Sequence, residues 1–135
     1  MIGEKTNMYH HYKISDAEQS VLEMLWKCGG EIKQTELLQQ FEASGKEWKR
    51  QTLNTLITRL AEKGLVSREN RIVKAIFSEK EFYNRKMEEM IDRTYYGKLS
   101  SFISAFTEYR GISEEEMQEI LSLLEQKRQS KLKDV

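Results

Sequence analysis

The feature of this sequence that most constrains its fold is a stripe of apolar residues in the middle of the chain. The stripe predicts an amphipathic helix from about Trp48 to Lys63, because its members recur at i, i+3, i+4 and i+7 and Gly64 supplies a stop. The members of the stripe are Leu53, Leu56, Ile57 and Leu60. A helix with one apolar face needs other elements to cover that face, so the stripe predicts a packed domain around it.

A β-hairpin signal follows this helix directly. Leu65–Arg68 and Ile72–Phe77 are rich in Val, Ile, Leu and Phe, and Asn70-Arg71 lie between them as a turn. The sequence therefore predicts a two-stranded ribbon that carries basic residues at its tip.

Two shorter helices are expected before the central one. Ser15 and Glu18 have the spacing of a capping box, which opens the first helix. A short extended piece is expected around Glu31–Gln34, and Thr35 can cap the second helix. Three helices followed by a ribbon is the winged-helix order, so we expect a mainly α fold with a small β-wing: a winged helix-turn-helix domain over residues 13–78.

Beyond Ser78 the pattern is helical, and the whole chain lacks proline. Three amphipathic stripes follow one another, and Ser113 with Glu116 forms a second capping-box spacing at the start of the last. Each stripe is too short to bury its own apolar face, so residues 79–130 are expected to form a helical dimerisation region in a homodimer. The residues expected at the contact are Phe82, Met90, Ile91, Tyr95, Leu99, Phe102, Ile103, Phe106, Met117, Ile120, Leu121 and Leu124.

The charges are unevenly distributed although the net charge is zero. Residues 46–74 contain eight basic and three acidic side chains, a net charge of +5, whereas residues 79–135 contain ten basic and twelve acidic ones, a net charge of −2. A basic middle on a neutral protein is typical of a DNA-facing patch. The alternative is a solvated surface that is rich in lysine.

The face of the central helix opposite its apolar stripe is polar but mostly uncharged. It carries Gln51, Thr55 and Thr58, with Asn54 beside them, and such side chains suit reading base edges. Lys49 and Arg50, at the start of the helix, suit phosphates. The residues expected to bind DNA are Trp48, Lys49, Arg50, Gln51, Thr52, Asn54, Thr55, Thr58, Arg59, Arg68, Arg71 and Lys74.

Other classes of protein find little support. No apolar run approaches the ~20 residues that span a bilayer, and the start has no apolar stretch like that of a signal peptide, so a cytoplasmic protein without membrane insertion is expected. Cys28, the single cysteine, rules out an intramolecular disulfide and falls on an apolar stripe, which favours a buried structural thiol. The His10-His11 pair lacks partners at metal-binding spacing, and no phosphate loop or nucleophile elbow occurs. We expect no metal, no cofactor and no enzymatic activity.

Several segments together resemble the penicillinase-repressor family (the BlaI/MecI/CopY type of winged-helix regulator) over roughly Ile14 to Leu124. The segments are Ile14-Ser15-Asp16-Ala17-Glu18 with Leu25-Trp26, Trp48 followed by Thr52-Leu53-Asn54-Thr55-Leu56-Ile57-Thr58-Arg59-Leu60, Lys63-Gly64-Leu65, Tyr95-Tyr96-Gly97, and Ile112-Ser113 before an acidic helix with Leu123-Leu124. The resemblance implies a dimer that binds palindromic operators of resistance or copper-handling genes. It also implies a recognition helix at about Trp48–Glu62, a wing at about Leu65–Phe77 and a C-terminal dimerisation region.

The chain departs from the family pattern at three places. Lys49-Arg50-Gln51-Thr52 replaces a common Ser-Pro-Lys-Thr, and Asn54 replaces a common arginine, so the operator is expected to differ. Ala105-Phe106 stands where a membrane sensor protease cuts an Asn-Phe bond in the β-lactam branch, which weighs against proteolytic induction. The tail lacks the paired cysteines of the copper branch, which weighs against copper sensing.

Two functions from different classes remain open at this point. The first is a transcriptional repressor whose dimer places two recognition helices in successive major grooves. The alternative is a winged-helix protein-interaction module that does not bind DNA, because a fold alone does not fix a function. The basic segment and the polar helix face favour the repressor.

Overall fold

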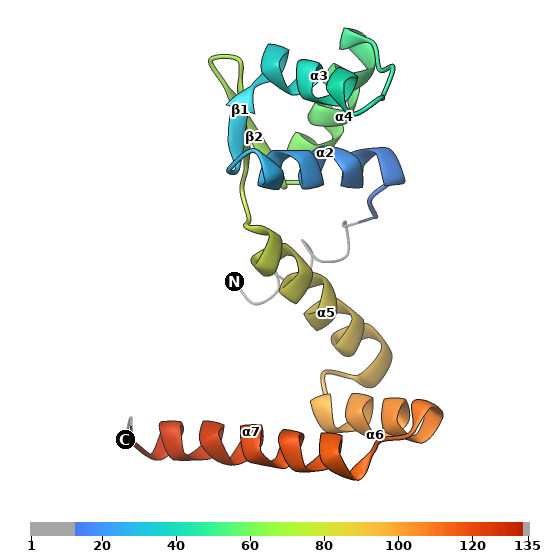
Figure 1. Ribbon diagram of the computed structural model, residues 1–135, viewed down its shortest axis with the longest axis vertical. Helices are drawn as coiled ribbons and strands as arrows, with labels where there is room; N and C mark the ends of the chain where they lie inside the picture. Colours follow the sequence, from blue (N-terminus) through green and yellow to red (C-terminus); the bar gives the residue numbers. More distant parts are fainter. Residues whose placement is uncertain (1–12, 134–135) are drawn as a thin grey trace. The chain divides into compact units, whose positions relative to one another are not determined.

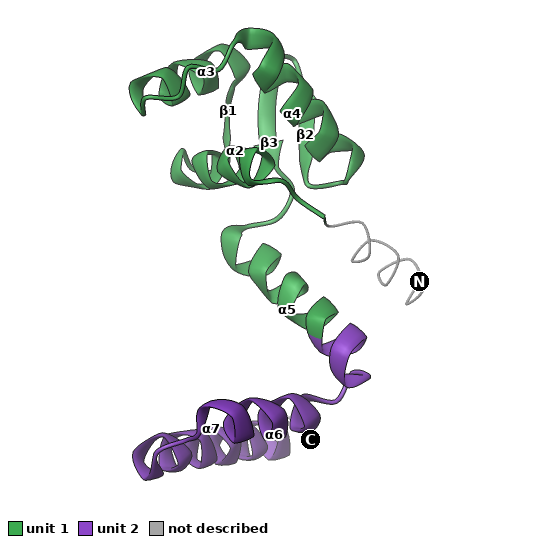
Figure 2. Ribbon diagram, turned by 90° about the vertical axis from the view of Figure 1, so that its right-hand side faces the viewer, with its two compact units in different colours: residues 1–90 green, residues 91–135 purple. Residues whose placement is uncertain are grey.

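The computed structural model describes residues 13–133 and divides the chain into two compact units, residues 1–90 and 91–135 (Figure 2). His10 and His11 lie outside the described residues. Within residues 13–90, the described part of the first unit, lie three helices, a small sheet and the first part of a fourth helix (Figures 1 and 2). Its elements are α2 (Asp16–Lys27), β1 (Glu31–Lys33), α3 (Gln34–Ala43), α4 (Arg50–Glu62), β2 (Val66–Glu69), β3 (Ile72–Ala75) and the start of α5 (Glu79–Tyr95).

The capping box predicted for the first helix is present. The Ser15 hydroxyl oxygen accepts a hydrogen bond from the backbone N–H of Glu18 at 3.1 Å. In return, a carboxylate oxygen of Glu18 accepts one from the backbone N–H of Ser15 at 3.3 Å. Two N–H groups that the helix itself leaves without partners are satisfied in this way.

The predicted hairpin is also confirmed, as strands β2 and β3. Asn70 and Arg71 join the strands with φ values of 53° and 65°, and positive φ at both central residues is the geometry of a two-residue type I′ turn. β1 pairs with β3 on the other side, which gives an antiparallel sheet of order β1-β3-β2. The sequence predicted the extended piece at β1 but not its pairing with the hairpin.

The core of the first unit lies between α2, α3, α4 and the sheet. The whole predicted stripe of α4 is buried in it, and no member is more than 6% exposed. The core residues are Val21, Leu22, Leu25, Leu37, Phe41, Leu53, Leu56, Ile57, Leu60, Leu65, Val66, Val73 and Phe82.

Phe82 corrects one expectation, because it was predicted at the contact with a second chain. It is fully buried, and its ring lies 5.4 Å from that of Trp26 on α2. The neighbouring Tyr83 accepts a hydrogen bond from the Gln19 side chain at 2.6 Å, and the Trp26 indole N–H donates to the Phe77 carbonyl at 2.9 Å. The first turns of α5 are thus packed onto α2, and the first unit extends beyond residue 78.

Three local expectations also need correction. The central helix begins at Arg50, so Trp48 lies in the preceding loop. α3 begins at Gln34 without a side-chain cap, so Thr35 does not cap it. Cys28 is the half-buried C-cap of α2 and not a member of its buried stripe.

The second unit contains the end of α5, α6 (Leu99–Arg110) and α7 (Glu114–Lys133). A row of aromatic rings connects the end of α5 to α6: Phe102 lies 5.6 Å from Tyr95 and 5.8 Å from Phe106. The Ser113 hydroxyl accepts from the Glu116 N–H at 3.1 Å, while the Glu116 carboxylate pairs with Arg110 at 2.6 Å. No residue of α6 or α7 is buried.

Candidate nucleic-acid interface

The two faces of α4 differ sharply in exposure. Gln51, Asn54, Thr55 and Thr58 are exposed, whereas the opposite face forms the core, as the helical period predicted. Thr52 and Arg59 are exposed as well. The helix therefore presents a row of polar side chains, most of them uncharged, on a rigidly packed support.

The start of α4 is basic and has no side-chain cap. Lys49 is the N-cap residue without a side-chain hydrogen bond, Arg50 follows it, and both are exposed. No acidic residue lies in the first turn. The free N–H groups and the positive end of the helix dipole favour an anion such as a phosphate beside these two side chains.

Trp48, a predicted DNA contact, packs against the edge of the core. Its ring lies 4.5 Å from that of Phe41, and Lys46 Nζ lies 5.0 Å from the centre of the Trp48 ring. The side chain is half-buried. These contacts fix the loop between α3 and α4, so Trp48 positions the helix start.

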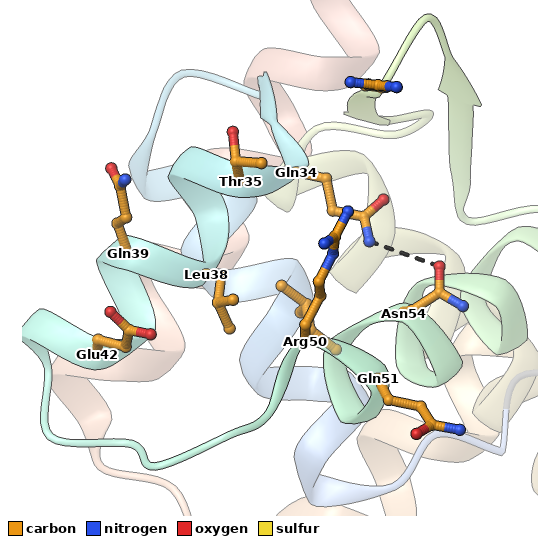
Figure 3. Close-up of a pocket in the computed structure, with 10 residues that line it drawn as sticks. Gln34, Thr35, Leu38, Gln39, Glu42, Arg50, Gln51 and Asn54 are labelled. Atoms are coloured by element: carbon orange, nitrogen blue, oxygen red, sulfur yellow. Dashed lines mark hydrogen bonds between the residues drawn. The ribbon is translucent and has the colours of Figure 1, made fainter.

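A groove of about 770 Å³ runs between α3 and α4 on the same side as the polar face. In Figure 3, Leu38 points into it from α3 and Arg50 from the start of α4. The groove is lined by Gln34, Thr35, Leu38, Gln39, Glu42, Arg50, Gln51, Leu53, Asn54 and Arg71. Four of these residues were predicted DNA contacts, so the groove is continuous with the candidate interface.

The wing contacts both helices of the interface. The backbone N–H of Gln34, at the start of α3, donates to the Arg71 carbonyl in the hairpin turn at 2.9 Å. Arg68 of β2 donates to the Asn54 side-chain oxygen at 3.0 Å and to the Asn54 carbonyl at 3.2 Å. The exposed Lys74 side chain leaves β3 on the opposite face of the sheet from buried Val73. The three cations of the wing that were predicted to contact DNA therefore have different surroundings. The Arg68 side chain is hydrogen-bonded to α4, whereas Arg71 lies in the hairpin turn and Lys74 on the opposite face of the sheet.

The contact between Arg68 and Asn54 leaves no signal in the sequence. The two residues belong to different elements and are 14 positions apart. No periodicity or motif indicates such a pair, because it depends on how the ribbon packs against the helix. Gln34 was missed for the same reason; its side-chain N–H donates to the Asn54 oxygen at 3.5 Å.

An ion pair fixes the other end of α4. Nζ of Lys63, the C-cap residue, lies 2.5 Å from a carboxylate oxygen of Glu18, which is almost fully buried. Burial alone would raise the pKa of Glu18, but hydrogen bonds from Lys63 and Ser15, together with the lysine charge, outweigh it and hold the pKa below its ordinary value.

The residues expected at a dimer contact, Phe82 apart, leave much apolar surface exposed. In α6, Leu99 is 55% and Phe106 42% exposed, and in α7, Leu121 is 53% and Leu124 54% exposed. Met90, Ile103 and Met117 are exposed to a lesser degree, while Ile91, Tyr95, Phe102 and Ile120 are partly buried. Ala105 and Phe106, the pair that the resemblance alone places at a protease-cleavage position, are exposed within α6.

None of the helices within residues 13–133 is long and apolar enough to cross a membrane. The same residues hold no group of three or more His, Cys, Asp or Glu side chains placed to bind a metal ion.

Comparison with known proteins points to a single family. The sequence model of the family described as penicillinase repressor matches residues 14–126. The methicillin resistance regulatory protein MecI of Staphylococcus aureus (strain N315) is 28% identical over 120 residues, which cover 86% of this chain and 96% of MecI. MecI of Mammaliicoccus sciuri is 27% identical with the same coverage. The penicillinase repressor of Bacillus licheniformis is 28% identical over 123 residues, 88% of this chain and 94% of the relative.

Proposed function

The chain belongs to the penicillinase-repressor family, and we propose that it represses transcription by binding a palindromic operator as a homodimer in the cytoplasm. Its relatives are named as repressors and resistance regulators, not as enzymes. The observation that carries the proposal is the exposed polar face of α4, which stands on a buried apolar stripe and begins with Lys49 and Arg50.

In this proposal α4 is the recognition helix and enters the major groove. Gln51, Asn54 and Thr55 face the bases, where amides can hydrogen-bond and threonine methyls can contact thymine. Lys49 and Arg50 contact the DNA phosphates beside the helix start. Arg71 and Lys74 of the wing contact the neighbouring part of the DNA backbone.

The homodimer is supported by the second unit. Leu99, Phe106, Leu121 and Leu124 are all more than 40% exposed, on helices that bury no residue of their own. Exposed apolar residues in such number are typical of an interaction surface, and a second copy of the same chain is the commonest occupant. Two linked DNA-binding units bind a two-fold symmetric operator far more tightly than one unit does.

The names of the relatives suggest which genes are controlled. Those names refer to methicillin resistance and penicillinase, so we propose a regulon of antibiotic-resistance or stress-response genes. No sensor protease is part of the proposal, because Ala105 replaces the asparagine of the family's cleavage site. Copper sensing through paired thiolates is not part of the proposal either, because the tail lacks the paired cysteines of the family's copper branch.

Selection from a pool of random duplexes tests the proposal. A dimeric repressor should enrich an inverted repeat, with half-sites about one helical turn or a multiple of it apart. A gel shift on DNA from upstream of its own gene, with random DNA of equal length as the control, then measures specificity. A winged-helix module that binds only proteins would enrich no sequence and shift neither DNA.

A further inference from the structure

The recognition face of α4 carries an amide whose hydrogen-bonding capacity is already partly used. Asn54 is exposed on this face, yet its side-chain oxygen accepts a hydrogen bond from Nη1 of Arg68 at 3.0 Å and one from Nε2 of Gln34 at 3.5 Å. An amide oxygen has two acceptor positions: Arg68 fills one, and Gln34 makes a longer contact at the other. A guanidinium can only donate, so the atom that Arg68 faces is the oxygen, and the NH₂ group of Asn54 is the part left for DNA.

Arg68 is held in this position by the architecture of the wing. It lies on β2 directly opposite Val73, which is fully buried, so its side chain leaves the sheet on the face toward the core and α4. Nη2 of Arg68 also donates to the Asn54 carbonyl at 3.2 Å and to the Thr58 hydroxyl at 3.4 Å. The Thr58 hydroxyl in turn donates to the Asn54 carbonyl at 2.9 Å. One guanidinium therefore ties together two residues that are one turn apart on the recognition helix.

This arrangement changes what Asn54 can recognise. Reading adenine takes both ends of the amide, because the oxygen accepts from N6 while the NH₂ donates to N7. An asparagine with an occupied oxygen can only donate. Guanine then suits it best because N7 and O6 are both acceptors, and thymine follows with O4, whereas adenine has the acceptor N7 but also the donor N6, for which the amide has no free acceptor.

We propose that Arg68 is a specificity-determining residue, which holds the Asn54 amide as a donor-only reader and directs it to guanine or thymine instead of adenine. This inference rests on the proposed function, because it assumes that α4 reads an operator. Arg68 acts through Asn54, so it is a positioning residue and its effect should appear in base preference.

The test uses the full-length protein and a duplex taken from the random pool. Asn54→Ala first identifies the base pair that Asn54 reads, as the position where discrimination between the four base pairs is lost. Affinities for the four duplexes that differ only there are then measured for wild type, Arg68→Met and Lys74→Met. Lys74→Met is the matched control: it also removes one positive charge from the wing, but on the opposite face of the sheet from Arg68.

The wild type should favour guanine or thymine over adenine at this position by about fivefold or more, the range of one good base contact. Arg68→Met removes the shorter hydrogen bond to the Asn54 oxygen and frees one acceptor position, so the preference should move to adenine. Lys74→Met should weaken binding to all four duplexes and leave their order unchanged. Thermal melting of Arg68→Met, an exposed site, should show a folded protein.

A wild type that already prefers adenine overturns the inference, and so does an unchanged preference in Arg68→Met. Specific operator binding in which Asn54→Ala alters no base preference also overturns it, while the proposed function stands. If no duplex is enriched from the random pool, the proposed function fails, and the inference fails with it.

Discussion

Nζ of Lys63 lies 2.5 Å from a carboxylate oxygen of Glu18, and this ion pair joins the first turn of α2 to the C-cap of α4. The Glu18 side chain is 5% exposed and that of Lys63 23%. The same carboxylate completes the capping box with Ser15, and the same ammonium donates to the Lys13 carbonyl at 2.6 Å. The Glu18 carboxylate and the Lys63 ammonium, each with more than one partner, thus set the orientation of α4, the candidate recognition helix, on α2.

Glu18→Gln should destabilise the first unit by about 1–3 kcal/mol. The substitution keeps an oxygen for the capping box but leaves the charge of Lys63 without its nearest counter-charge. Breaking a fully buried ion pair would lower the stability further, but Lys63 is partly exposed, which reduces the effect. Urea unfolding measures it as a lower midpoint. Glu18→Gln with Lys63→Met is the control, because it removes both charges and should recover part of the loss.

The contribution of this pair should depend on pH in one direction. The folded state lowers the pKa of Glu18 below its ordinary value of 4.5, so the folded state favours the ionised form. The stabilisation is therefore present above about pH 4.5 and is lost as the pH falls through the lowered pKa. The difference in unfolding free energy between wild type and Glu18→Gln should shrink from pH 7 to pH 3, and a constant difference would contradict the role of the charge.

Lys49→Ala and Arg50→Ala should weaken binding to specific and random DNA alike. Each side chain is expected to neutralise one phosphate, and each phosphate contact contributes about −0.9 to the slope of log K against log salt concentration. The measurement is a salt titration, in which the slope should fall in magnitude by about one unit for each variant. A slope that neither variant changes would show that the start of α4 does not contact the DNA backbone.

Gln51→Ala should act on specificity. Its exposed amide lies in the first turn of α4 on the polar face, so its loss should cost about 1–3 kcal/mol on the selected operator and little on random DNA. Competition gel shifts measure both affinities. Equal losses on the two kinds of DNA would assign Gln51 to the backbone instead of the bases.

Leu121→Glu or Phe106→Glu should convert the dimer to a monomer and lower operator affinity. Either change places a charge on the exposed apolar surface of the second unit, where a partner chain would have to bury it without a counter-charge. Analytical ultracentrifugation measures the mass. Gln126→Glu, an exposed polar position about half a helical turn from the α7 stripe, is the matched control and should remain dimeric. A wild-type monomer at micromolar concentration would contradict the prediction.

The parts of the fold that could be predicted are those whose signals are local in sequence. The stripe Leu53 to Leu60 repeats every three or four residues because one helix face is buried, and Asn70-Arg71 marks a two-residue turn between β-rich runs. The capping box joins Ser15 and Glu18, which lie within one helical turn of each other. Each of these signals needs no knowledge of the rest of the chain.

The parts that could not be predicted depend on which distant element covers a given face. Phe82 fits a helical stripe as well as its neighbours do, and only the packing of α5 on α2 places it against Trp26. β1 is three residues long, too short for its pairing with β3 to leave a pattern. Arg68 was interpreted as a DNA contact from its charge, whereas its position opposite Val73 directs it toward Asn54.

The most direct test of the account is a hydroxyl-radical footprint of the wild-type protein on the duplex selected from the random pool. Two recognition helices related by two-fold symmetry should protect two equivalent patches, centred about 10 base pairs or a multiple of the helical repeat apart. The dimer variants should lose both patches at the concentration where wild type protects them. A duplex without any protection at saturating protein, or a single asymmetric patch, would contradict the claim that this chain is a dimeric operator-binding repressor.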